Sequence, residues 1–234
     1  IMIPLFTFAL TPSIFFFFPE IVGTSLFGVF LNALSGTYAY VKQHRVYFKA
    51  AIPFAIATLP GAILGSLVSD YFTGPTFSLS YGIFILIISA IMYWNSSNKK
   101  AIATNFDETL FIARKKLGII LSMFVGFISS IFGIGGGIIH VPVMIYALAF
   151  PPHMATATSH FVLAVSSFMG VTSHIFLNHI VWIPALAVGF GAVIGAQIGA
   201  RLSKKTKPRS IILLLCISLF LLGIRMIVES NLLF

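Results

Sequence analysis

The chain has 234 residues, of which 59% are hydrophobic and only 8% are charged. Its mean hydropathy of +1.06 excludes a soluble domain, because such a domain could not bury so much apolar surface. The formal net charge of +9 lies in short clusters between apolar segments, which excludes a nucleic-acid-binding surface and is typical of the cytoplasmic loops of a multi-pass membrane protein.

Apolar segments long enough to cross a membrane follow one another along the chain. The longest polar stretch, 95–116, predicts a cytoplasmic linker between a first half, 1–94, and a second half, 117–234. Because the chain starts at Ile1, we expect the natural N-terminus and the first helix of the first half to be absent from it. The predicted segments are residues 1–18, 21–41, 50–68, 79–94, 117–150, 155–177, 182–202 and 211–228.

The two halves resemble each other when the sequence is shifted by 134 residues. Small and polar residues then coincide in order, and most other columns stay apolar, which predicts an internal repeat. The coinciding residues include Thr24-Ser25 with Thr158-Ser159, Gly36 with Gly170, Gly61-Ala62 with Gly195-Ala196, and Gly65 with Gly199.

Charge predicts that the two repeats are inverted in the membrane. Arg45 lies in a basic loop, which places that loop inside the cell, whereas the matching turn at Asn178-His179 has no lysine or arginine and must lie outside. Inverted repeats with broken helices are typical of secondary transporters, which hold the substrate near the interface between the repeats. The predicted fold is therefore an all-α polytopic membrane protein with two inverted-topology repeats and glycine-broken half-helices.

A glycine run interrupts the segment 117–150. It contains Gly133, Gly135, Gly136 and Gly137, and a broken helix at membrane depth is tolerated only where it is buried or lines a wet cavity. The charge pattern requires this segment to start and end inside, as two crossings or as a re-entrant hairpin. A flexible hinge or close helix packing without a ligand is the alternative interpretation of the run.

The pattern GxGGGxxxxP over residues 133–142, followed by PPxxAxATS over 151–159, resembles the second-repeat motif of the TauE/SafE (TSUP) family. A weaker match between residues 3 and 65 resembles the first repeat, without that repeat's glycine run. The resemblance implies an exporter of sulfite or organosulfonates, and it specifies no individual substrate.

Small and polar residues share one face of residues 155–177. Ser159, Ser166, Gly170 and Ser173 lie within roughly 60° of one another on a helix. The matching positions of the first half, Ser25, Asn32, Gly36 and Ala39, form a similar face. A compact oxyanion needs several neutral donors, and helix packing is the alternative. The predicted substrate site comprises Thr24, Ser25, Asn32, Thr158, Ser159 and Ser166, with the backbone of Gly135, Gly136 and Gly137 if the hairpin is re-entrant.

Two histidines within the predicted segments, His140 and His160, are candidates for proton coupling. The alternative for each is a neutral ring bonded to a carbonyl group. His174 and His179 are interpreted as loop or interface residues. Glycines spaced by four residues, at 61–65 and 191–199, predict close helix packing. No metal-ligand spacing occurs, and no cofactor is expected.

The sequence thus favours a secondary transporter of a small sulfur-containing anion such as sulfite, thiosulfate or an organosulfonate, with or without proton coupling. A passive anion channel is the alternative. An intramembrane enzyme is disfavoured, because Ser159 and His160 point about 100° apart around a helix and no other catalytic motif occurs. The expected location is the cell membrane, or the inner membrane of a Gram-negative bacterium, with lipid as the surroundings. The oligomeric state is open.

Overall fold

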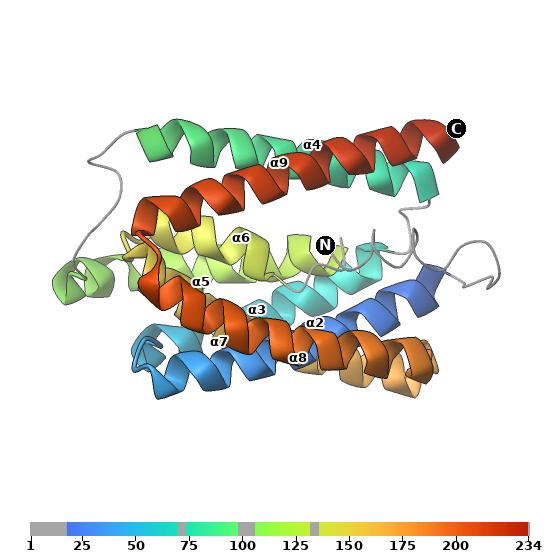
Figure 1. Ribbon diagram of the computed structural model, residues 1–234, viewed down its shortest axis with the longest axis horizontal. Coiled ribbons are helices and arrows are strands. Elements are labelled where there is room, and N and C mark those ends of the chain that lie inside the picture. Colours follow the sequence, from blue (N-terminus) through green and yellow to red (C-terminus); the bar gives the residue numbers. More distant parts are fainter. Residues whose placement is uncertain (1–17, 70–73, 98–105, 132–135, 234) are drawn as a thin grey trace.

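The computed structural model of the protein describes residues 18–69, 74–97, 106–131 and 136–233, and the regular structure in these ranges is helical (Figure 1). The predicted segment at the N-terminus, Gly133 and Gly135 lie outside these ranges. The elements are α2 (Phe18–Lys42), α3 (Phe48–Ser69), α4 (Gly74–Ser97), α5 (Glu108–Ile131), α6 (Gly137–Pro142), the π-helical turn η2 (Val143–Ala147), α7 (Pro152–Phe176), α8 (Trp182–Lys205) and α9 (Pro208–Leu233).

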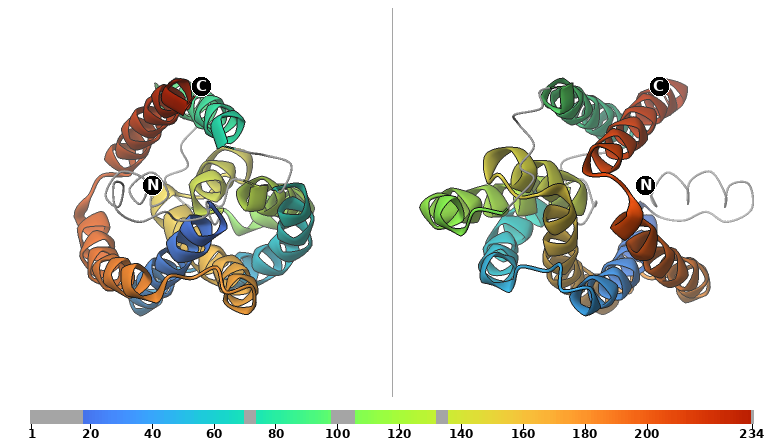
Figure 2. Two further views of the ribbon diagram at one scale, coloured as in Figure 1. Left: turned by 90° about the vertical axis from the view of Figure 1, so that its right-hand side faces the viewer. Right: turned by 60° about the vertical axis from the view of Figure 1, so that its left-hand side comes forward.

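Five of the described helices, α3, α4, α7, α8 and α9, are long and apolar enough to cross a membrane. This confirms the prediction of an all-helical multi-pass membrane protein. Figure 2 shows α4 and α9 on one side of the bundle and α2, α7 and α8 on the other, with α5 and α6 between them. The largest hydrophobic cluster joins α3, α4, η2, α7 and α9 around Phe54, Met144 and Ile212.

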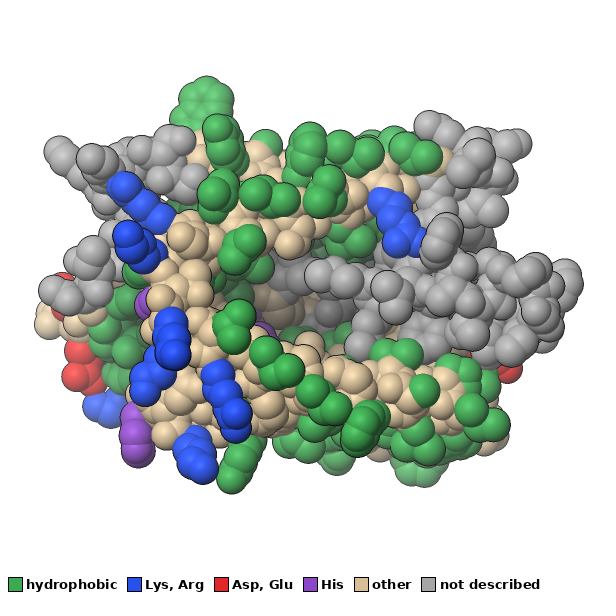
Figure 3. All heavy atoms as spheres, viewed as in Figure 1, with side chains coloured by type: hydrophobic (Ala, Val, Ile, Leu, Met, Phe, Trp, Pro, Cys, Tyr) green, Lys and Arg blue, Asp and Glu red, His purple; other side chains and the backbone are tan. Residues whose placement is uncertain are grey.

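Lysine and arginine side chains gather at one end of the bundle, on the left in Figure 3. Lys42 ends α2 there, and Lys204 and Lys205 end α8. Lys49 and Glu108 form an exposed ion pair of 2.7 Å between Nζ and Oε1. The positive-inside rule predicts that this end faces the cytoplasm. We call it the inner end, and the opposite end of α2 and α7 the outer end.

The 134-residue shift that aligns the two halves of the sequence also aligns their helices. The helices α7, α8 and α9 each begin 134 residues after α2, α3 and α4. The turns after α2 and α7 both contain a residue in the left-handed region, His44 with φ of 54° and Asn178 with φ of 55°. Helix α2 packs on α8, and α3 packs on α7 in the same way.

Helix α5 begins earlier than the sequence indicated, at Glu108 within the predicted linker. The Asp107 carboxylate accepts hydrogen bonds from the backbone N–H groups of Thr109 (2.9 Å) and Leu110 (3.1 Å). This is an N-cap, which satisfies donors that have no partner within the helix. The charged first turns of α5 therefore extend the helix at the inner end.

Close helix packing occurs at one of the two predicted glycine faces. A Cβ atom on Gly61 of α3 would collide with the carbonyl oxygen of Met123 in α5, and one on Gly126 of α5 would collide with that of Thr58. At Gly195, the α8 position that matches Gly61, no described atom lies within 4 Å of such a Cβ, and the same is true of Gly191 and Gly199. The expected close packing at 191–199 is therefore not seen among the described residues.

This contrast predicts that Gly61→Ala and Gly195→Ala have opposite effects on stability. Gly61→Ala should lower the free energy of unfolding by about 1–3 kcal/mol, because the methyl group pushes α5 away from α3. Gly195→Ala should be neutral or stabilising, since alanine has the higher helix propensity. Thermal unfolding in detergent measures both variants. Equal destabilisation would show that α8 is packed as tightly as α3.

Candidate functional site

The chain between α5 and α7 forms a hairpin. Helix α5 ends at Ile131, and Gly136 has a φ of 76°, a conformation that favours glycine. The chain then returns through six residues of α6 and five of η2. These residues rise about 16 Å, too little to cross the ~30 Å bilayer core. Of the two arrangements that the sequence left open, this short second arm favours the re-entrant hairpin.

Side-chain hydrogen bonds hold the two arms of the hairpin together. At the inner end Arg114 donates to the carbonyl oxygen of Ala147 (2.8 Å). Deeper in the bundle, Ser122 Oγ donates to the Gly118 carbonyl (2.7 Å) and lies 3.0 Å from His140 Nε2. Because the serine proton is already used, His140 Nε2 is the donor in this contact. Fully buried His140 thus joins α6 to α5, with the Phe54 ring stacked on it.

The second arm of the hairpin meets α7 near the middle of that helix. A Cβ on Gly137 would lie 2.9 Å from Leu163 Cδ2. Leu163 packs in turn against Ala33 of α2 in a buried cluster. Asn32 is next to Ala33, and Ser166 follows Leu163 by one turn of α7. We call this region, defined by Asn32, Ala33, Gly137, Leu163 and Ser166, the central crossing.

Helices α2 and α7 run antiparallel through the central crossing. On the inner side, a Cβ on Gly36 of α2 would lie 2.7 Å from His160 Cδ2 of α7. On the outer side, a Cβ on Gly170 of α7 would lie 2.6 Å from Leu26 Cδ2 of α2. Each glycine of one helix therefore faces a large side chain of the other, and the two contacts are related by the 134-residue shift.

The two predicted threonines lie at opposite ends of this helix pair. Thr24 Oγ1 accepts a hydrogen bond from the backbone N–H of Val181, just before α8 at the outer end (3.0 Å). Thr158 Oγ1 accepts one from the N–H of Tyr47, just before α3 at the inner end (3.1 Å). Thr158 precedes the end of α7 by 18 residues, or about 27 Å of helix. The structure therefore does not bring the two Thr-Ser pairs together.

The neighbouring serines are buried at the same two ends. Ser25 and Ser159 are each 1% exposed, and Ser159 Oγ donates to the carbonyl oxygen of Thr156 (3.0 Å). Of the residues predicted to bind the substrate, Gly137 lies against Leu163, while Asn32 is the chain neighbour of Ala33 and Ser166 follows Leu163 by one turn. Ser166 Oγ lies 3.2 Å from the Leu163 carbonyl, to which it donates. Gly135 lies outside the described residues.

His160 faces the interface between α2 and α7. Its Nδ1 lies 3.1 Å from the Thr156 carbonyl oxygen, so Nδ1 carries the proton and donates it. The ring makes an edge contact with Tyr40 of α2, with centroids 5.2 Å apart, and its other side lies against Gly36. His160 therefore presents Nε2 and Cδ2 to the α2 surface rather than to the hairpin.

Arg45 closes the inner end of the interface. Its Nη1 donates to Gln43 Oε1 and Ser203 Oγ (both 3.0 Å), and its Nη2 donates to the carbonyl oxygen of His153 (3.2 Å) and lies 2.9 Å from His153 Nδ1. The guanidinium also lies over the Tyr40 ring, 5.0 Å from its centroid. Burial lowers the pKa of Arg45, which nevertheless stays far above neutral pH. The sequence indicated only the charge of this residue.

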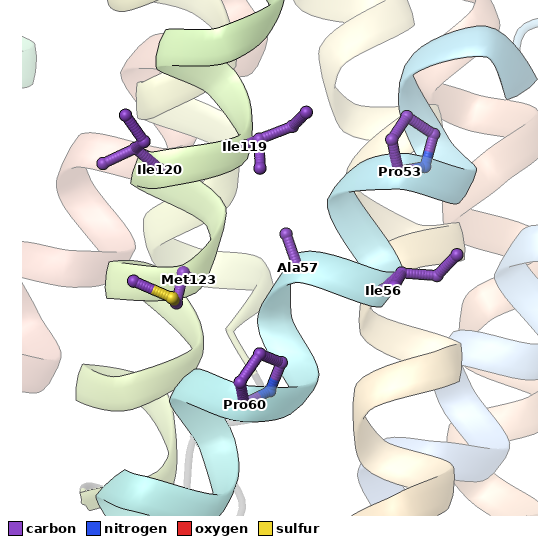
Figure 4. Close-up of a pocket in the computed structure, with 7 residues that line it drawn as sticks. All are labelled: Pro53, Ile56, Ala57, Pro60, Ile119, Ile120 and Met123. Carbon is purple, nitrogen blue, oxygen red and sulfur yellow. The ribbon is translucent and has the colours of Figure 1, made fainter.

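A groove of about 470 Å³ lies between α3 and α5 (Figure 4). Its lining is apolar and includes two prolines, whose short rings leave space between the helices. An anion would find no donor there, so we exclude the groove as a substrate site. The lining residues are Pro53, Ile56, Ala57, Pro60, Ile119, Ile120 and Met123.

Among the described residues, no three His, Cys, Asp or Glu side chains form a group that could hold a metal ion.

The profile of the family described as "Sulfite exporter TauE/SafE" matches residues 1–226. The chain belongs to the TauE/SafE family. It is 35% identical over 220 residues to "Probable membrane transporter protein YunE" of Bacillus subtilis, which covers 89% of this chain and 81% of the relative. A "Probable membrane transporter protein" of Methanocaldococcus jannaschii is 29% identical, covering 88% and 78%. No solved structure matches. The chain is thus a TauE/SafE-type membrane transporter and not an enzyme.

Sequence reasoning missed the residues that hold this TauE/SafE protein together at its ends and at its hairpin. Ser122 and Ser129 lie in α5, where they read as ordinary small residues of a membrane helix. Ser122 contacts His140, and a Cβ on Gly136 would lie 3.4 Å from Ser129 Oγ. In the sequence both serines precede the glycine run within one apolar segment, and this placement could have indicated these contacts.

Because Thr24 and Thr158 make matching hydrogen bonds, we predict that they contribute equally to the stability of the fold. Thr24→Val and Thr158→Val should each lower the free energy of unfolding by about 1–3 kcal/mol, because each leaves a partly buried backbone N–H without its acceptor. Thr172→Val is the matched control, since the Thr172 hydroxyl bonds only within its own helix, to the Phe168 carbonyl. Thermal unfolding of the purified protein measures all three. The role is refuted if Thr24→Val and Thr158→Val are as stable as Thr172→Val.

Proposed function

We propose that this protein exports a small sulfur-containing anion, such as sulfite, thiosulfate or an organosulfonate, by alternating access between two inverted repeats. The observation that carries the proposal is the reciprocal pair of bonds, Thr24 to Val181 and Thr158 to Tyr47. Each repeat closes one end of the interface with the other repeat. Rocking of one repeat against the other then opens one end while the other end stays closed.

The substrate class follows from the family and from the chemistry of the central crossing. The name of the family profile refers to sulfite export. The crossing offers neutral donors, the Asn32 amide and the backbone of Gly136 and Gly137, to which Ser166 adds its hydroxyl when it leaves the Leu163 carbonyl, and contains no described cation. Neutral donors hold an oxyanion without binding it so tightly that release stops.

We place the substrate at the central crossing, because Leu163 brings the hairpin tip, α2 and α7 together at mid-membrane. Thr24, Ser25, Thr158 and Ser159 then belong to the two closures rather than to the binding site. Proton coupling is part of the proposal. His160 is the better candidate, since it lies in the interface that rocks, whereas His140 is bound into the hairpin through Ser122.

Flux into proteoliposomes tests the proposal. Sulfite, thiosulfate, sulfoacetate, taurine and sulfate are offered with and without a pH gradient. We expect saturable transport of at least one sulfur anion, faster with the gradient. Flux that never saturates and ignores the gradient would show a passive anion channel, and no flux of any of the five would contradict the substrate class.

Variants at the central crossing test the site itself. Asn32→Ala or Ser166→Ala should weaken the apparent affinity roughly 10- to 150-fold, because one hydrogen bond to a charged group is worth about 1.5–3 kcal/mol. Ser25→Ala is the matched control, since its buried hydroxyl lies at the outer closure. The site is refuted if Asn32→Ala and Ser166→Ala transport with wild-type affinity, or if Ser25→Ala alone weakens it.

A further inference from the structure

The turn after α7, at the outer end, matches the turn after α2, at the inner end, but carries different side chains. Under the 134-residue shift, His174 takes the place of Tyr40, and His179 takes the place of Arg45. At the inner end the guanidinium lies over the Tyr40 ring. At the outer end the His179 ring lies over that of His174, with centroids 5.5 Å apart and planes inclined by 51°. A permanent cation at one end is thus replaced by two titratable rings at the other.

Both rings have a buried nitrogen atom without a partner. The Nδ1 atoms of His174 and His179 are buried and make no hydrogen bond with any described residue. Helix α2 covers the pair at Gly23, where a Cβ would lie 3.2 Å from His174 Cβ and would collide with the His179 carbonyl oxygen. Thr24, the next residue of α2, bonds to Val181 on the other side of the same turn. The partly exposed pair therefore lies against the contact that closes the outer end, with both Nδ1 atoms buried.

Few charged groups face this pair from the elements packed around it. Helix α2 contributes Glu20, one turn before Gly23. Helix α8 has no charged residue before Arg201, which lies near the inner end, and the outer half of α7 has no titratable group besides His174. A proton added to either Nδ1 would find no acceptor among the described residues while this contact stays closed.

We propose that His174 and His179 form a protonation switch for the outer end of the transporter. The neutral pair is compatible with the closed end seen here. A proton taken up from outside by either ring favours the open end, in which α2 leaves the turn and water solvates the imidazolium. The proposal rests on the proposed alternating access, to which it adds the residues that respond to external pH.

The direction of the pH dependence follows from linkage. The closed end binds fewer protons than the open end, so raising the external pH favours closure and lowering it favours opening. An exposed imidazole titrates near pH 6.5. The population of the open end should therefore increase between about pH 7.5 and 5.5.

The accessibility of Ile180, which is buried between the pair and Val181, measures this opening. Ile180→Cys is introduced with Cys216→Ser into the full chain in liposomes, and a membrane-impermeant maleimide is added outside. Ile183→Cys, at a position 85% exposed, corrects for the pH dependence of the labelling reaction. We expect the rate at 180 relative to 183 to rise about tenfold from pH 7.5 to 5.5, as for one proton taken up on opening.

Three variants identify the group whose protonation changes the relative labelling rate. The double variant His174→Asn with His179→Asn should change its relative rate less than twofold over the same range. His174→Tyr with His179→Arg, which copies the inner pair, should also lose the response and guards against a folding defect in the first variant. Glu20→Gln should keep the response. The proposal is overturned if the intact pair gives no pH response, if either double variant keeps it, or if Glu20→Gln abolishes it. No substrate is needed, so this outcome is independent of the flux experiments.

Discussion

The structure depends on two hydrogen bonds from backbone N–H groups to threonine hydroxyls, one at each end of the α2–α7 pair. A backbone N–H at the start of a membrane helix has no partner within the helix and little access to water. Each half of the chain supplies the missing acceptor to the other half. Each half therefore depends on the other for one of its turns, and the two bonds lie at the two ends where we propose that the interface opens.

The hairpin meets the α2–α7 pair near the middle of α7, where we propose that the substrate binds. Its second arm begins at Gly136, whose φ of 76° favours glycine, and Gly137 lies against Leu163 of α7, which packs on Ala33 of α2. Polar groups at that depth are stable only where protein or confined water satisfies them. The two ends of the α2–α7 pair differ in the side chains of their turns. Arg45 makes several hydrogen bonds at the inner end, whereas the matching His179 leaves Nδ1 without a partner among the described residues.

Much of the fold was predictable from the sequence, because apolar length, basic loops and the 134-residue shift report on local and repetitive properties. The helical fold, the family and the transporter class are confirmed, while the inverted relation of the repeats stays a prediction that the reciprocal contacts favour. The site was predictable only in part. Thr24 and Thr158 were found by the shift, but their acceptor role depends on turns in the opposite half, which no local pattern reveals. Likewise Gly61 and Gly195 look alike in sequence, and only the position of α5 separates them.

The most direct test of alternating closure uses one cross-link at each end in the Cys216→Ser background. Thr24→Cys with Val181→Cys reports on the outer end, and Thr158→Cys with Tyr47→Cys reports on the inner end. If the two ends open in turn, either cross-link alone stops transport, and a transported anion that slows formation of one speeds formation of the other. Transport that continues with either end cross-linked, or an anion that shifts both rates in the same direction, would contradict the account.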